Sequence, residues 1–165
     1  MQDWIEDELK TADFGDARLN ARYKILMNDL SRLPSESIPA ACEGWKETIA
    51  AYRFFDNPDI TEDGVLKSHY DATLRRIQQH PIVLLPQDTT EIEVTRPREK
   101  MKGARPLNEE SRVGFFNHVM LAVTAERIPL GVIGAKIYAR DMDEFLENKK
   151  TNKGTKEKKK KAKAD

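Results

Sequence analysis

The sequence predicts an α+β protein in which a helical N-terminal module precedes a small set of strands. Two observations lead to this fold class. Apolar residues recur at three- and four-residue steps as far as His80, which is the period of an amphipathic helix. From Pro81 onward short continuous apolar runs rich in β-branched residues take over, which is typical of strands. We therefore expect a helical module over 1–80, strands over 81–140 and a lysine-rich tail over 141–165.

Four helices are predicted in the helical module. The first is a short helix that starts at Asp3, and the second starts after Asp16, a residue type that caps helix N-termini. The third runs from about Gly44 to Asp56, and the fourth begins after Thr61, which is also a capping residue. The expected apolar faces are Leu19, Tyr23, Leu26, Met27, Leu30 and Leu33 in the second helix, Trp45, Ile49, Tyr52 and Phe55 in the third, and Leu66, Tyr70, Leu74 and Ile77 in the fourth.

Three strands are predicted after the helices. Residues 82–85 form an apolar run that predicts a strand buried on both faces, with residues 87–90 as its polar C-terminal tip. Residues 96–111 are charged and irregular, which favours a loop, and residues 115–123 and 130–138 read as the arms of a β-hairpin. Three strands are too few for a sheet covered on both faces, so we expect an incomplete sheet.

Charge is strongly segregated along the chain. The whole sequence balances 28 basic against 28 acidic residues, yet residues 148–165 hold nine lysines and two acids. Such an arm attracts polyanions through contacts that weaken steeply with salt, although a disordered solubilising tail explains the composition equally well. The one cysteine, Cys42, excludes an internal disulfide, and no apolar run approaches a membrane span. A cytoplasmic protein with no membrane partner is therefore expected.

Asp88 is the candidate metal ligand. A carboxylate at the tip of a buried strand is held in place and open to substrate, and Mg²⁺ prefers such oxygen ligands. One carboxylate cannot hold two metal ions, and a turn starting at Asp88 and Thr89 is the plainer interpretation. His118 lies in an apolar strand, where it either lines a site or is a hydrogen-bonded core histidine.

Four basic residues on the predicted helices are candidates for contact with DNA. Arg18 and Arg22 lie four residues apart on one polar helix face, a spacing suited to adjacent phosphates or guanine edges. Lys46 and Arg53 on the third helix could extend this surface. The alternative is that these side chains only solvate helix faces or pair with nearby acids.

Motifs in four places, taken together, resemble the N-terminal part of the Tn-five-type cut-and-paste transposases of the IS-four superfamily. They are Asp3-Trp4, Ala12-Asp13-Phe14-Gly15-Asp16-Ala17-Arg18, Ala51-Tyr52-Arg53-Phe54-Phe55-Asp56-Asn57-Pro58 and Gln87-Asp88-Thr89-Thr90. Four motifs in this order are more specific than any one of them, and the resemblance covers residues 3 to about 140.

The resemblance implies a helical domain that recognises transposon-end DNA, followed by a ribonuclease H-like catalytic domain. In that family an Asp-Asp-Glu triad acts on two Mg²⁺ or Mn²⁺ ions, and its first aspartate would be Asp88 here. Thr89 and Thr90 would fix the loop or line the site, and the hairpin with His118 would supply the next strands. Arg18 and Arg22 carry over as expected contacts with double-stranded DNA at terminal inverted repeats.

The sequence also departs from the family. After Arg140 we find neither the strand that would bring the second aspartate nor the Tyr-Arg-Glu-Lys helix with the glutamate. Where relatives often carry two adjacent arginines, this chain has Arg18-Leu19. We therefore expect a truncated transposase, bacterial and associated with the nucleoid, that binds DNA without cutting it. Two alternatives stay open: a regulator that inhibits full-length transposase or forms dimers with it, and an inert remnant.

Overall fold

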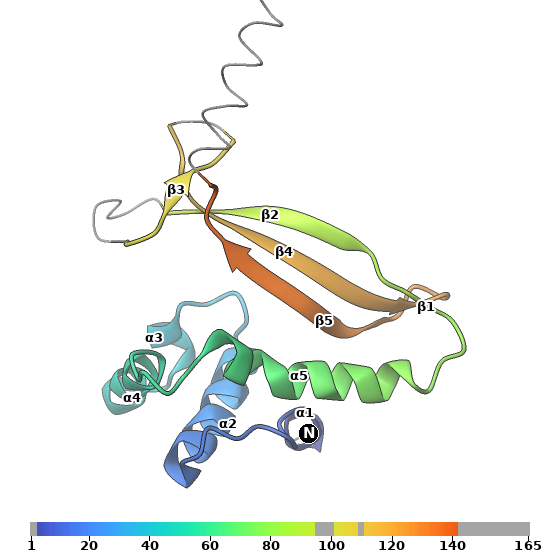
Figure 1. Ribbon diagram of the computed structural model, residues 1–165. Coiled ribbons are helices and arrows are strands. Elements are labelled where there is room, and N and C mark those ends of the chain that lie inside the picture. Colours follow the sequence, from blue (N-terminus) through green and yellow to red (C-terminus); the bar gives the residue numbers. More distant parts are fainter. Residues whose placement is uncertain (1–2, 95–100, 109–110, 142–165) are drawn as a thin grey trace, which may run out of the picture. The chain divides into compact units, whose positions relative to one another are not determined.

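In the computed structural model the chain is an α+β protein whose helices come first and whose strands form an antiparallel sheet (Figure 1). The structure describes residues 3–94, 101–108 and 111–141. Its elements in chain order are α1 (Asp3–Glu8), α2 (Ala17–Arg32), α3 (Ile38–Ala41), α4 (Trp45–Phe55), α5 (Glu62–Ile77), β1 (Val83–Leu84), β2 (Gln87–Glu93), β3 (Arg105–Pro106), β4 (Val113–Thr124) and β5 (Pro129–Tyr138). The predicted lysine-rich tail lies outside the described residues, apart from its first residue.

The chain divides into two compact units. The first, called the helical unit, comprises Met1–Pro86 and Leu121–Ile133, so it holds all five helices, β1 and the ends of β4 and β5 nearest their connecting turn. The second, called the sheet unit, comprises Gln87–Met120 and Gly134–Asp165, with β2, β3 and the remaining parts of β4 and β5. Strands β4 and β5 therefore contribute residues to both units.

Two of the predicted helix caps are confirmed. The Asp16 side chain accepts a hydrogen bond from the Arg18 backbone N–H at 2.7 Å, and α2 starts at the next residue. Thr61 Oγ1 accepts from the Gly64 N–H at 3.1 Å at the start of α5. Each cap satisfies a backbone donor that has no partner inside the helix. The short helix α3 was not predicted, because its four residues are too few to show a period.

The core of the helical unit is built around Phe54. Its ring stacks parallel to that of Tyr23 with centroids 5.8 Å apart, and Phe14 meets both rings edge-on at 5.6 and 5.2 Å. Leu26, Cys42 and Ala51 complete the buried cluster. The Tyr23 hydroxyl donates to the Val65 carbonyl at 2.7 Å, so the ring is fixed at both ends. Phe14 follows α1, so the cluster ties the segment between α1 and α2 to both α2 and α4.

The predicted apolar face of α4 is not the buried one. Its buried residues are Thr48, Ala51 and Phe54, whereas Trp45 is 78% exposed and Tyr52 is exposed as well. Phe54 sits about 90° or more around the helix from that aromatic stripe, since each residue turns the helix by about 100°. Only one of the two apolar faces can pack on α2. The face with Phe54 packs there, because Phe54 belongs to the aromatic cluster of the core.

The buried face of α5 was also predicted incorrectly. The helix buries three small or medium residues, Ser68, Ala72 and Thr73, while Leu74 is 45% exposed. Small residues occupy this face because backbone approaches it closely at Gly131, where an added Cβ would lie 2.3 Å from Thr73 Oγ1. Periodicity shows where apolar side chains recur, but it does not show where close packing against another segment requires small side chains.

The strand around Asp88 differs from the prediction. β1 has two residues, Pro86 follows it, and the polar residues 87–90 open the next strand, β2, instead of ending a buried one. Leu84 is 53% exposed. A strand is buried on both faces only where other elements pack on each face, and the described residues do not cover both faces of β1.

Strand β4 pairs antiparallel with β1, β2, β3 and β5. The register with β2 places Asp88 opposite Val119 and Thr89 opposite His118. The predicted β-hairpin is confirmed as β4 and β5, whose turn includes Arg127 at φ +68°. The short strand β3 falls inside the segment predicted as a loop.

Candidate functional site

Arg18 projects from the first turn of α2. Its side chain is 92% exposed, and its guanidinium donates to the Asp16 carboxylate from Nη2 at 2.8 Å and from Nε at 3.3 Å. These hydrogen bonds hold the pKa of Asp16 below its usual range and raise the pKa of Arg18. A guanidinium carries five N–H donors, so Arg18 keeps donors for a further acceptor while Asp16 orients it.

Arg22 is half-buried one turn further along α2, near Cys42. Burial raises the pKa of the Cys42 thiol, Asp29 acts in the same direction, and the positive charge of Arg22 opposes it. The thiol is thus a neutral, packed side chain. Since Glu47 of α4 acts on the same thiol, the Arg22 side of α2 lies near the start of α4.

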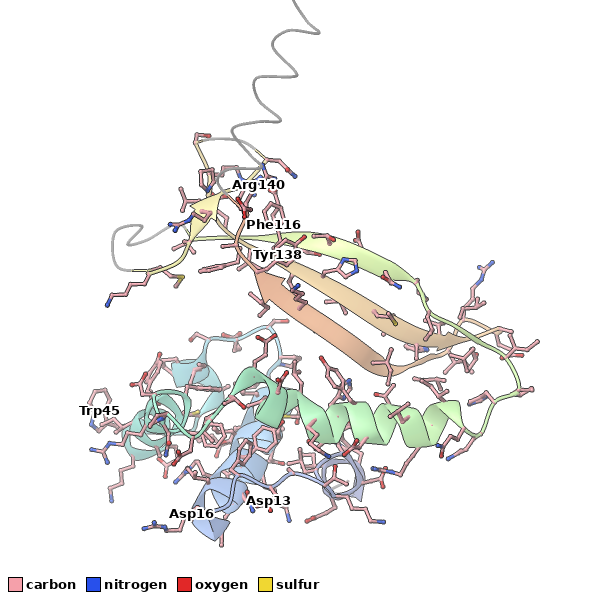
Figure 2. All side chains as sticks on the ribbon, in the orientation of Figure 1. Asp13, Asp16, Trp45, Phe116, Tyr138 and Arg140 are labelled. Carbon is pink, nitrogen blue, oxygen red and sulfur yellow. The ribbon has the colours of Figure 1, made fainter. Side chains whose placement is uncertain are left out.

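The outer face of α4 combines aromatic and basic side chains. We use this name for five residues, Trp45, Lys46, Ile49, Tyr52 and Arg53, of which all but Ile49 are exposed. Figure 2 shows Trp45 pointing away from the helices. Lys46 and Arg53 lie seven residues apart, which is about 10 Å along a helix and places them on one side. The structure therefore brings two of the predicted basic residues together beside exposed rings.

Asp88 and His118 do not share a face of the sheet. Successive residues of a strand point to opposite faces, so Asp88 and Thr90 lie on one face and Thr89 on the other. His118, opposite Thr89, accepts a hydrogen bond from its hydroxyl at Nδ1 over 2.7 Å and donates from Nε2 to Gln87 Oε1 over 3.1 Å. His118 therefore fixes Thr89 and does not line a site with Asp88.

A divalent metal ion needs more ligands than the neighbourhood of Asp88 supplies. Asp88 Oδ1 accepts a hydrogen bond from the Thr89 backbone N–H at 2.8 Å. Within residues 3–94, 101–108 and 111–141, no group of three histidine, cysteine, aspartate or glutamate residues is placed to hold a metal ion. The described residues therefore do not fit a two-metal centre by themselves, and we derive no catalytic step from one.

The sheet unit contains side-chain contacts that the sequence did not predict. Arg112 pairs with Glu91 at 2.6 Å and with Glu93 at 2.9 Å. Phe116 stacks on Tyr138 with ring centroids 5.5 Å apart, and the Arg140 guanidinium lies 5.0 Å from the centroid of the Phe116 ring (Figure 2). These contacts join residues 19 to 24 positions apart in the sequence, so no local pattern could indicate them.

The comparison with known families bears on the helical unit. Residues 1–60 match the family described as transposase DNA-binding. The N-terminal region is thus similar to that of a transposase. The matched residues include α1 to α4 and therefore Arg18, Arg22 and the outer face of α4. The match supports DNA as a partner of this region and does not extend to the strands. Separately, none of the described helices has the length and apolar character to cross a bilayer.

Proposed function

We propose that this chain binds the double-stranded DNA of transposon ends, and that α2 and the outer face of α4 make the contact. The observation that carries the proposal is the transposase DNA-binding match over residues 1–60, the segment that bears the exposed aromatic and basic face. Resemblance to the Tn-five-type transposases of the IS-four superfamily adds terminal inverted repeats as the expected site.

The chemistry of the outer face suits a duplex. Lys46 and Arg53 offer charges for phosphates, which position a protein on DNA without reading its sequence. Trp45 and Tyr52 offer flat rings with apolar bodies, which can contact sugars and thymine methyl groups. Arg18 adds a guanidinium already oriented by Asp16, and a guanidinium is suited to paired contacts with phosphate or guanine.

Replacing Lys46 or Arg53 with alanine is expected to weaken binding to a terminal inverted repeat by about tenfold, equal to about 1.4 kcal/mol. Each substitution removes one phosphate contact, so the slope of log K against log salt should fall by about 1. Fluorescence anisotropy with labelled end DNA over a salt series measures both quantities.

Lys67→Ala is the matched control for these variants. Lys67 is an exposed cation on α5, where it pairs with Asp71 at 2.7 Å, and it is not on the proposed surface. Its removal should leave the affinity within about twofold and the salt slope unchanged. Equal losses in all three variants would show that binding depends on overall charge, and unchanged affinity in Lys46→Ala and Arg53→Ala would contradict the proposed surface.

We further propose that the sheet unit corresponds to the start of a ribonuclease H-like catalytic domain. In that case Asp88 would supply one carboxylate to Mg²⁺ or Mn²⁺, and strand transfer would require acidic ligands that the described residues do not provide. A dimer, or a complex with full-length transposase, would be one way of bringing such ligands together.

The 165-residue polypeptide is expected to bind end DNA without nicking it in Mg²⁺ or Mn²⁺, because Asp88 alone cannot hold two ions. Asp88→Asn should leave DNA affinity within about twofold, since Asp88 belongs to the sheet unit and the proposed DNA surface to the helical unit. Supercoiled-plasmid nicking and anisotropy measure the two properties. Metal-dependent nicking that Asp88→Asn abolishes would show a complete site and overturn this part of the proposal.

A further inference from the structure

Glu8, the last residue of α1, is a buried carboxylate that the proposed DNA contact does not use. Its side chain is 7% exposed and accepts from Arg76 of α5 at 2.8 Å (Nη1 to Oε2) and 3.3 Å (Nη2 to Oε1). His69 of α5 donates to the same carboxylate from Nδ1. Burial alone would raise the pKa of Glu8, but the hydrogen bonds from Arg76 and His69 outweigh it and lower that pKa. Glu8 is therefore an ionised acceptor that holds the side chains of Arg76 and His69 in place.

The second ring nitrogen of His69 faces the backbone of β5. The Val132 N–H donates to His69 Nε2 at 2.9 Å, so this nitrogen carries a lone pair and no proton. The proton of a neutral imidazole must then sit on Nδ1, where it is directed at Glu8. This contact belongs to the helical unit and joins α5 to residues more than sixty positions later in the chain.

Two neighbouring contacts hold the same short segment of β5 on α5. Arg76 Nε donates to the Leu130 carbonyl at 2.5 Å. Between Leu130 and Val132, Gly131 adopts φ +139°, and a Cβ there would lie 2.3 Å from Thr73 Oγ1 and 3.2 Å from His69 Cε1. A residue with a side chain could not approach so closely, so the segment is shaped to rest on this part of α5.

Charged and titratable groups face His69 from each element packed around it. Glu8 comes from α1 and carries a negative charge, and Arg76 comes from α5 and carries a positive charge. Tyr23 of α2 lies near Glu8, and burial chiefly raises the pKa of its hydroxyl, with Glu8 adding to the effect. Arg75 and Asp7 form an ion pair at 3.5 Å at the solvent-exposed rim. β5 contributes the backbone groups of residues 130–132.

We propose that Glu8, His69, Arg76 and residues 130–132 form a proton-sensitive clasp that releases this segment of β5 from α5 when His69 gains a proton. A proton added at Nε2 replaces the acceptor by a second donor, which then points at the Val132 N–H. The hydrogen bond is lost and the half-buried Val132 N–H is left without its partner, which favours the open arrangement. The clasp is closed while His69 is neutral and opens when His69 gains a second ring proton.

This conformational device does not depend on DNA binding, because it involves none of the residues assigned to the DNA surface. Failure of the DNA proposal would leave the clasp intact, and failure of the clasp would leave the DNA surface intact. Their tests are separate: one measures DNA affinity, and the other measures the exchange of a backbone amide in the absence of DNA.

Amide hydrogen exchange and ¹⁵N NMR of the full chain between about pH 5 and 8 test the clasp. We expect the protection factor of the Val132 amide to fall at least tenfold once the ring ¹⁵N shifts show that His69 is protonated. In His69→Gln, a side-chain carbonyl can accept from Val132 without titrating, so protection should not change over this range. His118→Gln, in the sheet unit, is the matched control and should retain the wild-type profile.

Two results would overturn the proposal. One is a Val132 protection factor that stays constant while the ring ¹⁵N shifts show His69 gaining a proton, or that falls equally in His69→Gln. The other comes from the wild-type protein alone, so it holds even if a variant does not fold: ring ¹⁵N shifts that place the neutral proton of His69 on Nε2 would exclude the hydrogen bond on which the clasp depends.

Discussion

Replacing Phe54 with alanine is expected to lower the free energy of unfolding of the helical unit by about 3–5 kcal/mol, the range for removing a buried aromatic ring. The Phe54 side chain is 2% exposed and makes ring contacts with Phe14, Tyr23 and Phe55 at 5.6–5.8 Å between centroids. Its loss leaves a cavity between α2 and α4. Such a change removes a large part of the total stability of an ordinary domain. Urea unfolding followed by far-ultraviolet circular dichroism measures it.

Phe55→Ala is the matched control, because the neighbouring ring is 45% exposed. Its removal should cost about 1 kcal/mol or less, since a half-exposed side chain loses less transfer free energy and leaves no closed cavity. Equal destabilisation by the two substitutions would show that the cluster around Phe54 is not the core of the helical unit.

Replacing Gly114 with alanine is expected to disrupt the end of the sheet unit and to cost about 3 kcal/mol or more, as severe overpacking does. A Cβ at Gly114 would lie 1.9 Å from the Ile92 carbonyl oxygen and 3.1 Å from Glu93 Cα. Gly114 is paired with Glu93 on one side and Arg105 on the other, so the backbone cannot move away without breaking a ladder. The Val94 N–H, which donates to Val113 O at 2.8 Å, should exchange faster with solvent.

Gly134→Ala tests whether the effect belongs to the close contact at Gly114. Gly134 is also a strand glycine of the sheet unit, but an added Cβ would meet Met120 Cβ at 4.0 Å, an ordinary van der Waals distance. This substitution should change stability by less than about 1 kcal/mol, because alanine also restricts the unfolded chain. Normal protection of Val94 in Gly114→Ala would contradict the tight contact.

Elements that depend on local interactions could be predicted from the sequence. Asp16 and Thr61 were recognised as caps because a cap is a hydrogen bond between a side chain and a backbone group two or three residues away. The β4–β5 hairpin was recognised from two apolar arms around a short turn. The motifs also led to a transposase resemblance, which the family match over residues 1–60 supports in part.

Which surfaces pack against one another depends on long-range contacts and could not be predicted from local patterns. Both faces of α4 carry aromatic residues, and the choice of Phe54 over Trp45 depends on Phe14 and Tyr23, which lie elsewhere in the sequence. Asp88 was expected at the tip of a strand and His118 in an apolar strand, and only the register of β2 on β4 shows that the two lie on opposite faces of the sheet. The contact of Glu8 with His69 spans 61 residues. Periodicity and capping are local properties of the chain, whereas burial and pairing depend on residues that folding brings together from distant positions.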